Sequence, residues 1–215
     1  MPRIETTQRT LYTFAELSDS AKETAREWWR RSENEDWYGA ESIIEDACRV
    51  ADILGISFST KTVKLYGGCT RQDPVVYWSG FYSQGDGACF EGDYSYSKGA
   101  AKRIREYAPE DKRLHAIADA LQEVQKRNFY RLAARMRHSG RYYHSGCMSV
   151  DVEHVDDSYR DIGDAESVVT DQMRAFADWI YRQLKSEYEY TMSDENVDES
   201  IETNGYEFDE SGNIA

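Results

Sequence analysis

The stretch that most constrains the fold is residues 75–96, where two runs rich in aromatic and β-branched residues flank Gln84-Gly85-Asp86-Gly87. Glycine adopts the positive φ angles that a tight reversal requires, and aspartate tolerates them. The pattern predicts a β-hairpin with strands near residues 75–83 and 88–96. We expect this hairpin at the centre of a sheet on which helices pack.

A second hairpin is predicted further along the chain. Residues 130–138 alternate so that their arginines fall on one side, which predicts a strand with a cationic outer face. Residues 147–155 alternate in the same way and place Asp151 and Glu153 on the outer face of a returning strand. Opposite charges on neighbouring strands attract each other, so these two strands are expected to pair.

Apolar residues at helical spacing predict the helices that cover this sheet. The first two helices are expected to be separated by an acidic connector, residues 32–36, and the second is expected to end at Gly55 in the left-handed conformation. A strand over 56–66 and a loop over 67–74 then lead into the first hairpin. Further helices are predicted at 98–107, at 110–126, over roughly 25 residues from Asp164, and at 193–204, before an edge strand at 206–208.

Together these elements predict an α+β protein, with a mostly antiparallel sheet of four to six strands built on two hairpins and packed against several α-helices. A chain of 215 residues is long enough for one large domain, and it shows no internal repeat. We expect a single domain over residues 1–192. The acidic C-terminal segment, residues 193–215, is expected to be an appendage that holds the short helix and the edge strand.

The net charge of −14 is unevenly distributed. Residues 1–150 hold 22 Lys/Arg against 21 Asp/Glu, whereas residues 151–215 hold 4 against 19. Such an acidic field repels nucleic acid, so no direct nucleic-acid contact is expected, and it favours a protein partner with a basic surface. The alternative is that the acidic segment only increases solubility.

Other global features of the sequence predict a cytoplasmic protein. No apolar run reaches the length of about 20 residues that a membrane span needs, and the N-terminus lacks the apolar core of a signal peptide. The four cysteines form no C-x-x-C pair and are expected to be reduced there. No cofactor is expected.

Three motifs are distinctive: residues 14–28 (FAELSDSAKETAREW), residues 79–88 (SGFYSQGDGA) and residues 144–150 (HSGCMSV). They resemble a poorly characterised family of small bacteriophage and prophage proteins. Some members of that family carry an automatic antitoxin label. The resemblance implies a phage or mobile-element accessory protein in the cytoplasm of a bacterial host, and it supplies no catalytic residues.

A ligand pocket is one candidate site, between the turn at 83–87 and residues 138–147. Its predicted lining is Ser83, Gln84, Asp86, His144 and Cys147. The turn could bind an anion through backbone N–H groups, but no helix follows it and no Walker A pattern is present. His138, His144 and Cys147 match no zinc signature, and a Cys–His pair alone is a weak sign of a nucleophile, so neither a metal nor a catalytic residue is expected.

The acidic residues are the favoured candidate, because carboxylates offer Arg and Lys the same acceptor geometry as phosphates. We expect a non-enzymatic protein that binds and inhibits a host protein, in particular a nucleic-acid-targeting defence component, by acidic mimicry of nucleic acid. Alternatives are an antitoxin-like neutraliser of a toxin, a small enzyme or ligand binder using the pocket, and a virion or assembly factor. The basic residues of 98–142 are expected to neutralise the acidic elements within the fold or across a homodimer. The predicted partner-binding residues are Asp156, Asp157, Asp161, Asp164, Glu187, Glu189, Asp194, Glu195, Asp198 and Glu199.

Overall fold

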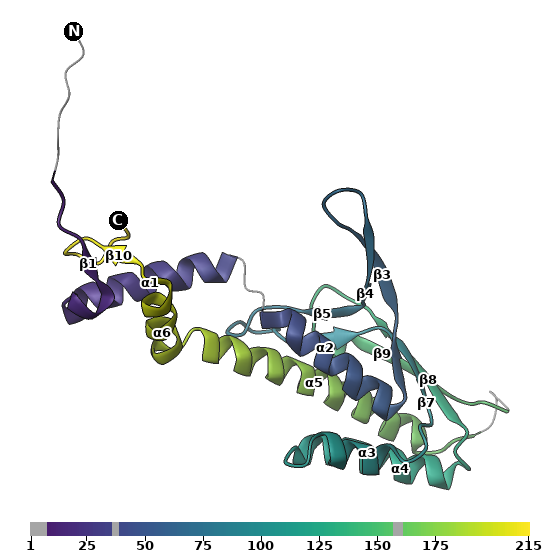
Figure 1. The fold of residues 1–215 in the computed structure, drawn as a ribbon. Coiled ribbons are helices and arrows are strands. Elements are labelled where there is room, and N and C mark those ends of the chain that lie inside the picture. Colours follow the sequence, from purple (N-terminus) through teal and green to yellow (C-terminus); the bar gives the residue numbers. More distant parts are fainter. Residues whose placement is uncertain (1–7, 36–38, 157–160) are drawn as a thin grey trace. The chain divides into compact units, whose positions relative to one another are not determined.

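A computed structural model describes residues 8–35, 39–156 and 161–215 and shows an α+β protein, as expected (Figure 1). The chain divides into two compact units. Unit 1 comprises residues 1–40 and 186–215, and unit 2 comprises residues 41–185. These boundaries differ from the division at residue 193 that the charge distribution suggested, because the C-terminal segment packs with the N-terminal helix.

Unit 1 is built around the contact between its first and last helices. The helices α1 (Asp19–Glu35) and α6 (Asp194–Asn204) share an apolar core with the short helix η1 (Phe14–Glu16). Strand β1 (Tyr12–Thr13) pairs antiparallel with β10 (Glu207–Phe208). The predicted edge strand therefore exists and its partner is the N-terminal strand. The buried core residues are Phe14, Leu17, Ala21, Ala25, Trp29, Val197, Ile201 and Phe208.

The ends of these helices follow the capping signals of the sequence with one exception. The Ser193 hydroxyl accepts a hydrogen bond from the backbone N–H of Asn196, and Gly205 ends α6 with a φ of 65°. The exception is the predicted connector at 32–36, because α1 continues through Glu35. Most of the predicted connector is thus helical, and residues 36–38 lie outside the described residues.

The main sheet of unit 2 has four antiparallel strands in the order β2-β7-β8-β9. Arg135 lies opposite Asp151 and Ala133 lies opposite Glu153, so the predicted pairing of the basic and acidic strands is confirmed. Side chains alternate between a buried and an exposed face, as a sheet covered by helices on one side requires. The strands are β2 (Ile56–Phe58), β7 (Gly92–Ser95), β8 (Leu132–His138) and β9 (Met148–His154).

The hairpin of residues 75–96 is present, but its strands are shorter than predicted. Strand β5 (Val76–Trp78) pairs with β6 (Ala88–Phe90), and residues 79–87 form the connection. These two strands form a sheet of their own, so the expectation that the hairpin lies at the centre of the main sheet is wrong. The second predicted strand changes partners at Glu91. The backbone N–H of Ser59 donates to Glu91 O (2.8 Å), that of Glu91 to Val75 O (3.0 Å), and that of Val75 to Ser59 O (2.7 Å). This ring of bonds joins three residues that each separate two successive strands of the chain.

The predicted loop at 67–74 is wrong over most of its length. Strand β4 (Thr70–Pro74) pairs antiparallel with β3 (Thr60–Lys64), and only residues 65–69 form the connecting turn. Gly67 and Gly68 take positive φ angles there. Both faces of this two-stranded ribbon are largely exposed, so β4 has polar residues on both faces. Its sequence therefore lacks the apolar alternation by which a strand is recognised. Figure 1 shows the ribbon extending beyond the rest of unit 2.

The helices of unit 2 lie close to their predicted positions. Strand β8 begins at Leu132 rather than at residue 130, because Phe129 and Tyr130 both have positive φ angles (54° and 61°). Residue Cys147 belongs to the short helix η2 (Ser145–Cys147), so β9 begins one residue later than predicted. The helices are α2 (Gly39–Leu54), α3 (Ala100–Tyr107), α4 (Lys112–Arg127) and α5 (Ala165–Thr191), the last of which continues into unit 1.

The core of unit 2 lies between the buried face of the sheet and these helices. The ring of Phe176 in α5 stacks on Phe58 at 6.3 Å and meets Phe90 edge-on at 5.7 Å. The buried side chain of Gln125 donates to Leu132 O (2.8 Å) and accepts from Leu132 N (3.2 Å). This amide fixes α4 against the start of β8. No helix among the described residues is long and apolar enough to cross a membrane.

Candidate functional site

The turn at 83–87 touches the loop at 139–147, as the pocket hypothesis required. A Cβ atom added to Gly85 would lie 3.4 Å from the ring of Tyr142, and one added to Gly87 would lie 3.0 Å from Tyr143 O and 3.1 Å from His144 Cα. The two segments are thus in van der Waals contact. They leave no gap at Gly87 for a ligand.

The polar groups of this junction bind one another. The Asp86 carboxylate accepts hydrogen bonds from the backbone N–H groups of Tyr82 (3.0 Å) and Ser83 (2.6 Å), which closes the turn. The side chains of Ser83 and Gln84 are exposed. His144 Nδ1 accepts from the N–H of Gly146 at 2.9 Å and caps η2. Asp86 and His144 therefore have structural roles that do not require a ligand.

The thiols near this junction lack the surroundings of an activated nucleophile. Burial, followed by the neighbouring Cys147, raises the pKa of the Cys89 thiol to about 12. A thiol with this pKa stays protonated at neutral pH. Cys147 is half-buried. The Nε2 atom of His138 forms a hydrogen bond with Tyr142 O at 3.1 Å. Within residues 8–35, 39–156 and 161–215, no three His, Cys, Asp or Glu side chains come together as a metal site would need.

Around the junction, tyrosines form an exposed surface that we call the aromatic platform: Tyr82, Tyr142 and Tyr143. The Tyr143 ring stacks on Tyr77 at 5.0 Å, which fixes the loop to β5. Tyr82 and Tyr142 are 74% and 56% exposed. Large, rigid tyrosines with little conformational entropy to lose are typical of protein-binding surfaces. The platform is thus better suited to contact a protein than to enclose a small molecule.

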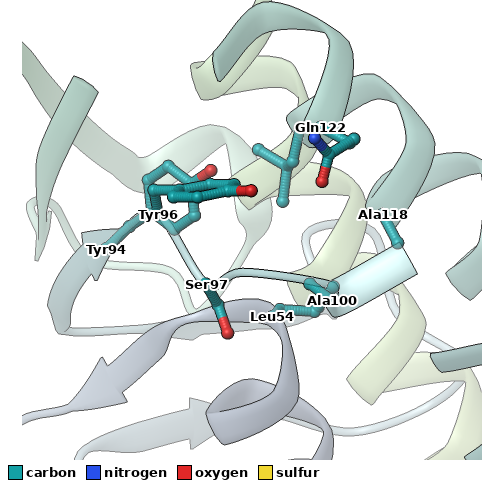
Figure 2. A pocket seen from close by; sticks show the side chains of 8 residues that line it. Leu54, Tyr94, Tyr96, Ser97, Ala100, Ala118 and Gln122 are labelled. Atoms are coloured by element: carbon teal, nitrogen blue, oxygen red, sulfur yellow. The ribbon is translucent and has the colours of Figure 1, made fainter. Parts of the chain in front are cut away.

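Two hollows lie elsewhere in unit 2. A cavity beneath α3 and α4 has a volume of about 10 Å³, enough for a single water molecule (Figure 2). A shallow groove of about 630 Å³ lies on the exposed face of the four-stranded sheet. Its side chains include the ion pair of Arg135 and Asp93, at 2.9 Å, together with Arg137, Asp151 and Glu153. Because the groove carries charges of both signs, it has little selectivity for an anionic or a cationic ligand.

The acidity of the chain belongs to unit 1. This unit holds 6 Lys/Arg against 18 Asp/Glu, a net of −12, whereas unit 2 holds 20 against 22, a net of −2. The sequence had located the acids in the last third of the chain. The structure adds the acids of the N-terminal helix to the same unit, since α1 and α6 pack together.

Two of the predicted partner-binding acids of α6 form ion pairs with arginines of α1. Arg26 in α1 binds both carboxylate oxygens of Asp198, at 2.6 and 2.7 Å, and Arg30 forms an ion pair with Asp194. These bonds raise the pKa of the Arg26 guanidinium, chiefly through Asp198. Asp194 and Asp198 therefore hold the helices together and are less available to a partner.

The outer side of α6 presents a second row of acids. Glu195, Glu199 and Glu202 are exposed and follow one another at the i, i+4, i+7 spacing of a single helix face. None of them forms an ion pair with another described residue. We call these three residues the glutamate row. Sequence reasoning missed Glu202, although continuing the helical spacing from Glu195 and Glu199 leads to it.

The remaining predicted acids are scattered. In unit 2, Asp156 pairs with Arg131 at 3.5 Å and Asp164 pairs with Arg127 at 3.1 Å. Arginines of the basic stretch 98–142 thus neutralise nearby acids, as one of the alternatives expected. Asp161 accepts a hydrogen bond from the N–H of Gly163. Glu187 and Glu189 lie on α5. Asp157 lies outside the described residues.

The chain matches one protein family, described as a domain of unknown function (DUF8835), over residues 37–194. No curated protein and no solved structure matches it.

Proposed function

We propose that this chain, which belongs to the DUF8835 family, is a phage or mobile-element accessory protein that binds and inhibits a host protein. The partner would be a nucleic-acid-targeting defence component with a basic surface. The likeness of three sequence motifs to bacteriophage and prophage proteins supports the origin. The charge of unit 1, a net of −12, supports the kind of partner.

The glutamate row is the observation that carries this proposal. Glu195 and Glu199, four residues apart, are separated by about 6 Å along the helix axis, and Glu199 and Glu202, three residues apart, by about 4.5 Å. The first of these separations is close to the axial spacing of every second phosphate on a DNA strand, about 6.8 Å. Glu195, Glu199 and Glu202 thus offer carboxylates to Arg and Lys side chains that normally hold a phosphate backbone. Unit 1 itself repels nucleic acid, so its partner is a protein.

Neutralisation of a toxin is a variant of the same activity and would use the same surface. Catalysis finds less support, because Asp86 and His144 are bound within the turn and the loop and the Cys89 thiol is protonated at neutral pH. The aromatic platform adds a second protein-contact surface on unit 2.

The test is a pull-down from a bacterial host lysate with the tagged full-length chain, followed by mass spectrometry. We expect one stoichiometric partner that is released at high salt, because the contact is electrostatic. The variant Glu195→Lys/Glu199→Lys/Glu202→Lys should lose that partner.

A matched control changes the charge by the same amount on unit 2. Glu110→Lys/Glu123→Lys/Asp171→Lys alters three exposed acids there and should retain the partner. If both triple variants keep the partner, or both lose it, the glutamate row is not the binding surface.

A further inference from the structure

Strand β9 (Met148–His154) lies at one edge of the main sheet, because the strand order is β2-β7-β8-β9. It has seven residues, whereas β2 at the opposite edge has three. Among the described residues, no strand pairs with the outer side of β9. A long, open edge strand is a template to which another extended chain can add.

The register of β8 and β9 shows which backbone groups of β9 point away from β8. Val155 N donates to Arg131 O at 2.8 Å, just beyond one end of the strand pair. Ser139 N donates to Cys147 O at 2.9 Å, just beyond the other end. Hydrogen-bonded and non-hydrogen-bonded residues alternate in an antiparallel pair, so the odd-numbered residues of β9 bond β8. The N–H and C=O groups of its even-numbered residues therefore point toward the outer edge.

Arg174 in α5 covers one end of this outer edge. Its Nη2 atom donates to Met148 O at 3.3 Å, as expected for an even-numbered residue whose carbonyl points outward. The next two outward-pointing residues are Val150 and Val152, whose side chains belong to the inner face, where Val150 is buried. Their N–H and C=O groups form no hydrogen bond with a described residue on the outer side. We call these two donors and two acceptors the open edge.

The exposed face of β9 is acidic along the open edge. Asp151 and Glu153 project from this face, are exposed, and form no ion pair with another described residue. Arg135 lies opposite Asp151, but its guanidinium binds Asp93 at 2.9 Å on the side of β7. The hydrogen bond to Asp93 is also the main cause that raises the pKa of Arg135, ahead of the charges of Glu153 and Asp151. The two carboxylates of β9 are therefore available to another cation.

These acids decide what kind of strand can add to β9. Pairing with the same strand of a second copy would bring Asp151 and Glu153 beside the same carboxylates, and like charges on neighbouring strands destabilise a pair. Lysines or arginines at alternate positions have the opposite effect, as the arginine of β8 opposite Asp151 illustrates. Arg137 would repel such cations, but it lies opposite Ser149, beyond the open edge.

We propose that β9 binds an extended segment of another protein, which adds to the sheet as a further strand and carries Lys or Arg at alternate positions. The backbone of the segment forms hydrogen bonds with the open edge, and its cations pair with Asp151 and Glu153 on the exposed face. Its intervening side chains lie beside Val150 and Val152 on the inner face, so they are apolar. The backbone bonds supply affinity and the two carboxylates supply specificity.

This site goes beyond the proposed inhibition of a host protein and does not depend on the glutamate row. Strand β9 lies in unit 2 and within residues 37–194, the part of the chain that matches the DUF8835 family. The glutamate row lies in unit 1, after the end of that match. Either site can therefore fail its test while the other passes.

The probe is a fluorescein-labelled peptide as long as β9, Lys-Val-Lys-Val-Lys-Val-Lys, and its counterpart has glutamate in place of every lysine. Binding to the full-length protein is measured by fluorescence anisotropy at low and at physiological salt. We expect saturable binding of the lysine peptide, weaker at the higher salt, and no binding of the glutamate peptide. In the complex, NMR hydrogen exchange should show protection of the Val150 and Val152 amides.

The decisive variant is Val152→Pro, which removes an outward N–H and leaves the hydrogen bonds between β8 and β9 intact. It should weaken binding of the lysine peptide at least about tenfold, because the added strand loses a hydrogen bond and meets the proline ring. Val152→Ala is the matched control, since it keeps the N–H, and it should bind the peptide as tightly as the unaltered chain. Asp151→Asn/Glu153→Gln should weaken binding about fivefold through the loss of two charge pairs. Circular dichroism establishes that each variant is folded.

A cationic peptide is also attracted to the acids of unit 1, so Glu195→Lys/Glu199→Lys/Glu202→Lys is tested in parallel and should retain peptide binding at physiological salt. Loss of the peptide in that variant alone would assign it to the glutamate row and overturn the proposal. The proposal is also overturned if the lysine peptide fails to bind at low salt, if both peptides bind equally, or if Val152→Pro binds like Val152→Ala. Should Val152→Pro fail to fold, the amide protection and Asp151→Asn/Glu153→Gln decide, and an unchanged result in either overturns the proposal.

Discussion

Arg26 binds Asp198 through two parallel hydrogen bonds, Nε to Oδ1 at 2.6 Å and Nη2 to Oδ2 at 2.7 Å, although 172 residues separate them. This bidentate pair connects the first and last helices of the chain. It divides the acids of α6 into an inner row that holds unit 1 together and the outer glutamate row that faces solvent. Net charge alone therefore overstates how many of these acids a partner can reach.

The Arg26–Asp198 pair should contribute measurably to the stability of unit 1. Replacing Arg26 with alanine leaves a half-buried carboxylate without its guanidinium and should lower the free energy of unfolding by about 1–2 kcal/mol. Urea denaturation monitored by tryptophan fluorescence measures the change, since Trp28 and Trp29 lie in α1. Arg31→Ala removes an exposed arginine from the same helix and should change stability far less. Equal effects of the two variants would show that the pair is not important.

The amide of Gln125 should be difficult to replace. In Gln125→Met the side chain keeps its length, but Leu132 N and Leu132 O lose their partners inside the core. Each unsatisfied buried group costs about 1–3 kcal/mol, so we expect a loss of about 2–4 kcal/mol in the free energy of unfolding. Gln122→Met alters a half-buried residue of the same helix beside the small cavity of Figure 2 and serves as the control. If Gln125→Met hardly changed the free energy of unfolding, the backbone groups of Leu132 would have found other hydrogen-bond partners.

Gly55 joins α2 to β2 at a point where no side chain fits. Its φ of +88° is left-handed, and a Cβ atom would lie 2.2 Å from Ser95 O. Gly99 has a similar φ of +76°, but a Cβ atom there meets nothing within 4 Å. Gly99→Ala should therefore cost only the backbone strain, about 1–2 kcal/mol. Gly55→Ala should cost about 3 kcal/mol or more, because β7 must move as well. Thermal denaturation of the two variants tests this difference.

The protein should lose stability in alkaline solution. Burial raises the pKa of the Cys89 thiol from 9.0 to about 12 and that of the Tyr94 phenol from 10.0 to about 12. Both groups stay protonated in the folded chain when the unfolded chain has begun to ionise. The stabilisation is complete below pH 9 and is lost as the pH rises toward 12, by up to about 1.4 kcal/mol per pH unit for each group.

Urea titrations between pH 8 and pH 11 measure this loss. Cys89→Ala lowers stability at every pH because it removes packed atoms, but it should reduce the pH dependence above pH 9, because it removes one of the groups whose pKa burial raises. An unchanged slope in this variant would assign the alkaline sensitivity to other groups.

Local patterns in the sequence determined most elements of the structure. Ser193 and Gly205 bracket α6 because a hydroxyl cap and a left-handed glycine act within a few residues of chain. The period-two alternation of residues 132–138 and 148–154 likewise predicted β8 and β9, with Arg135 opposite Asp151. The spacing of apolar residues along the sequence also predicted α5 and the buried face of the sheet, because it shows which side of a helix or strand is apolar.

Only the tertiary structure decided which segments meet. The strand β4 was missed because its polar residues lack alternation, and its partner β3 lies outside the main sheet. The exchange of partners among Ser59, Val75 and Glu91 has no local signal, because each bond joins residues far apart in the chain. The same holds for the acids. The sequence alone determined their number and helical spacing, whereas the packing of α1 against α6 decided which carboxylates face arginine and which face solvent.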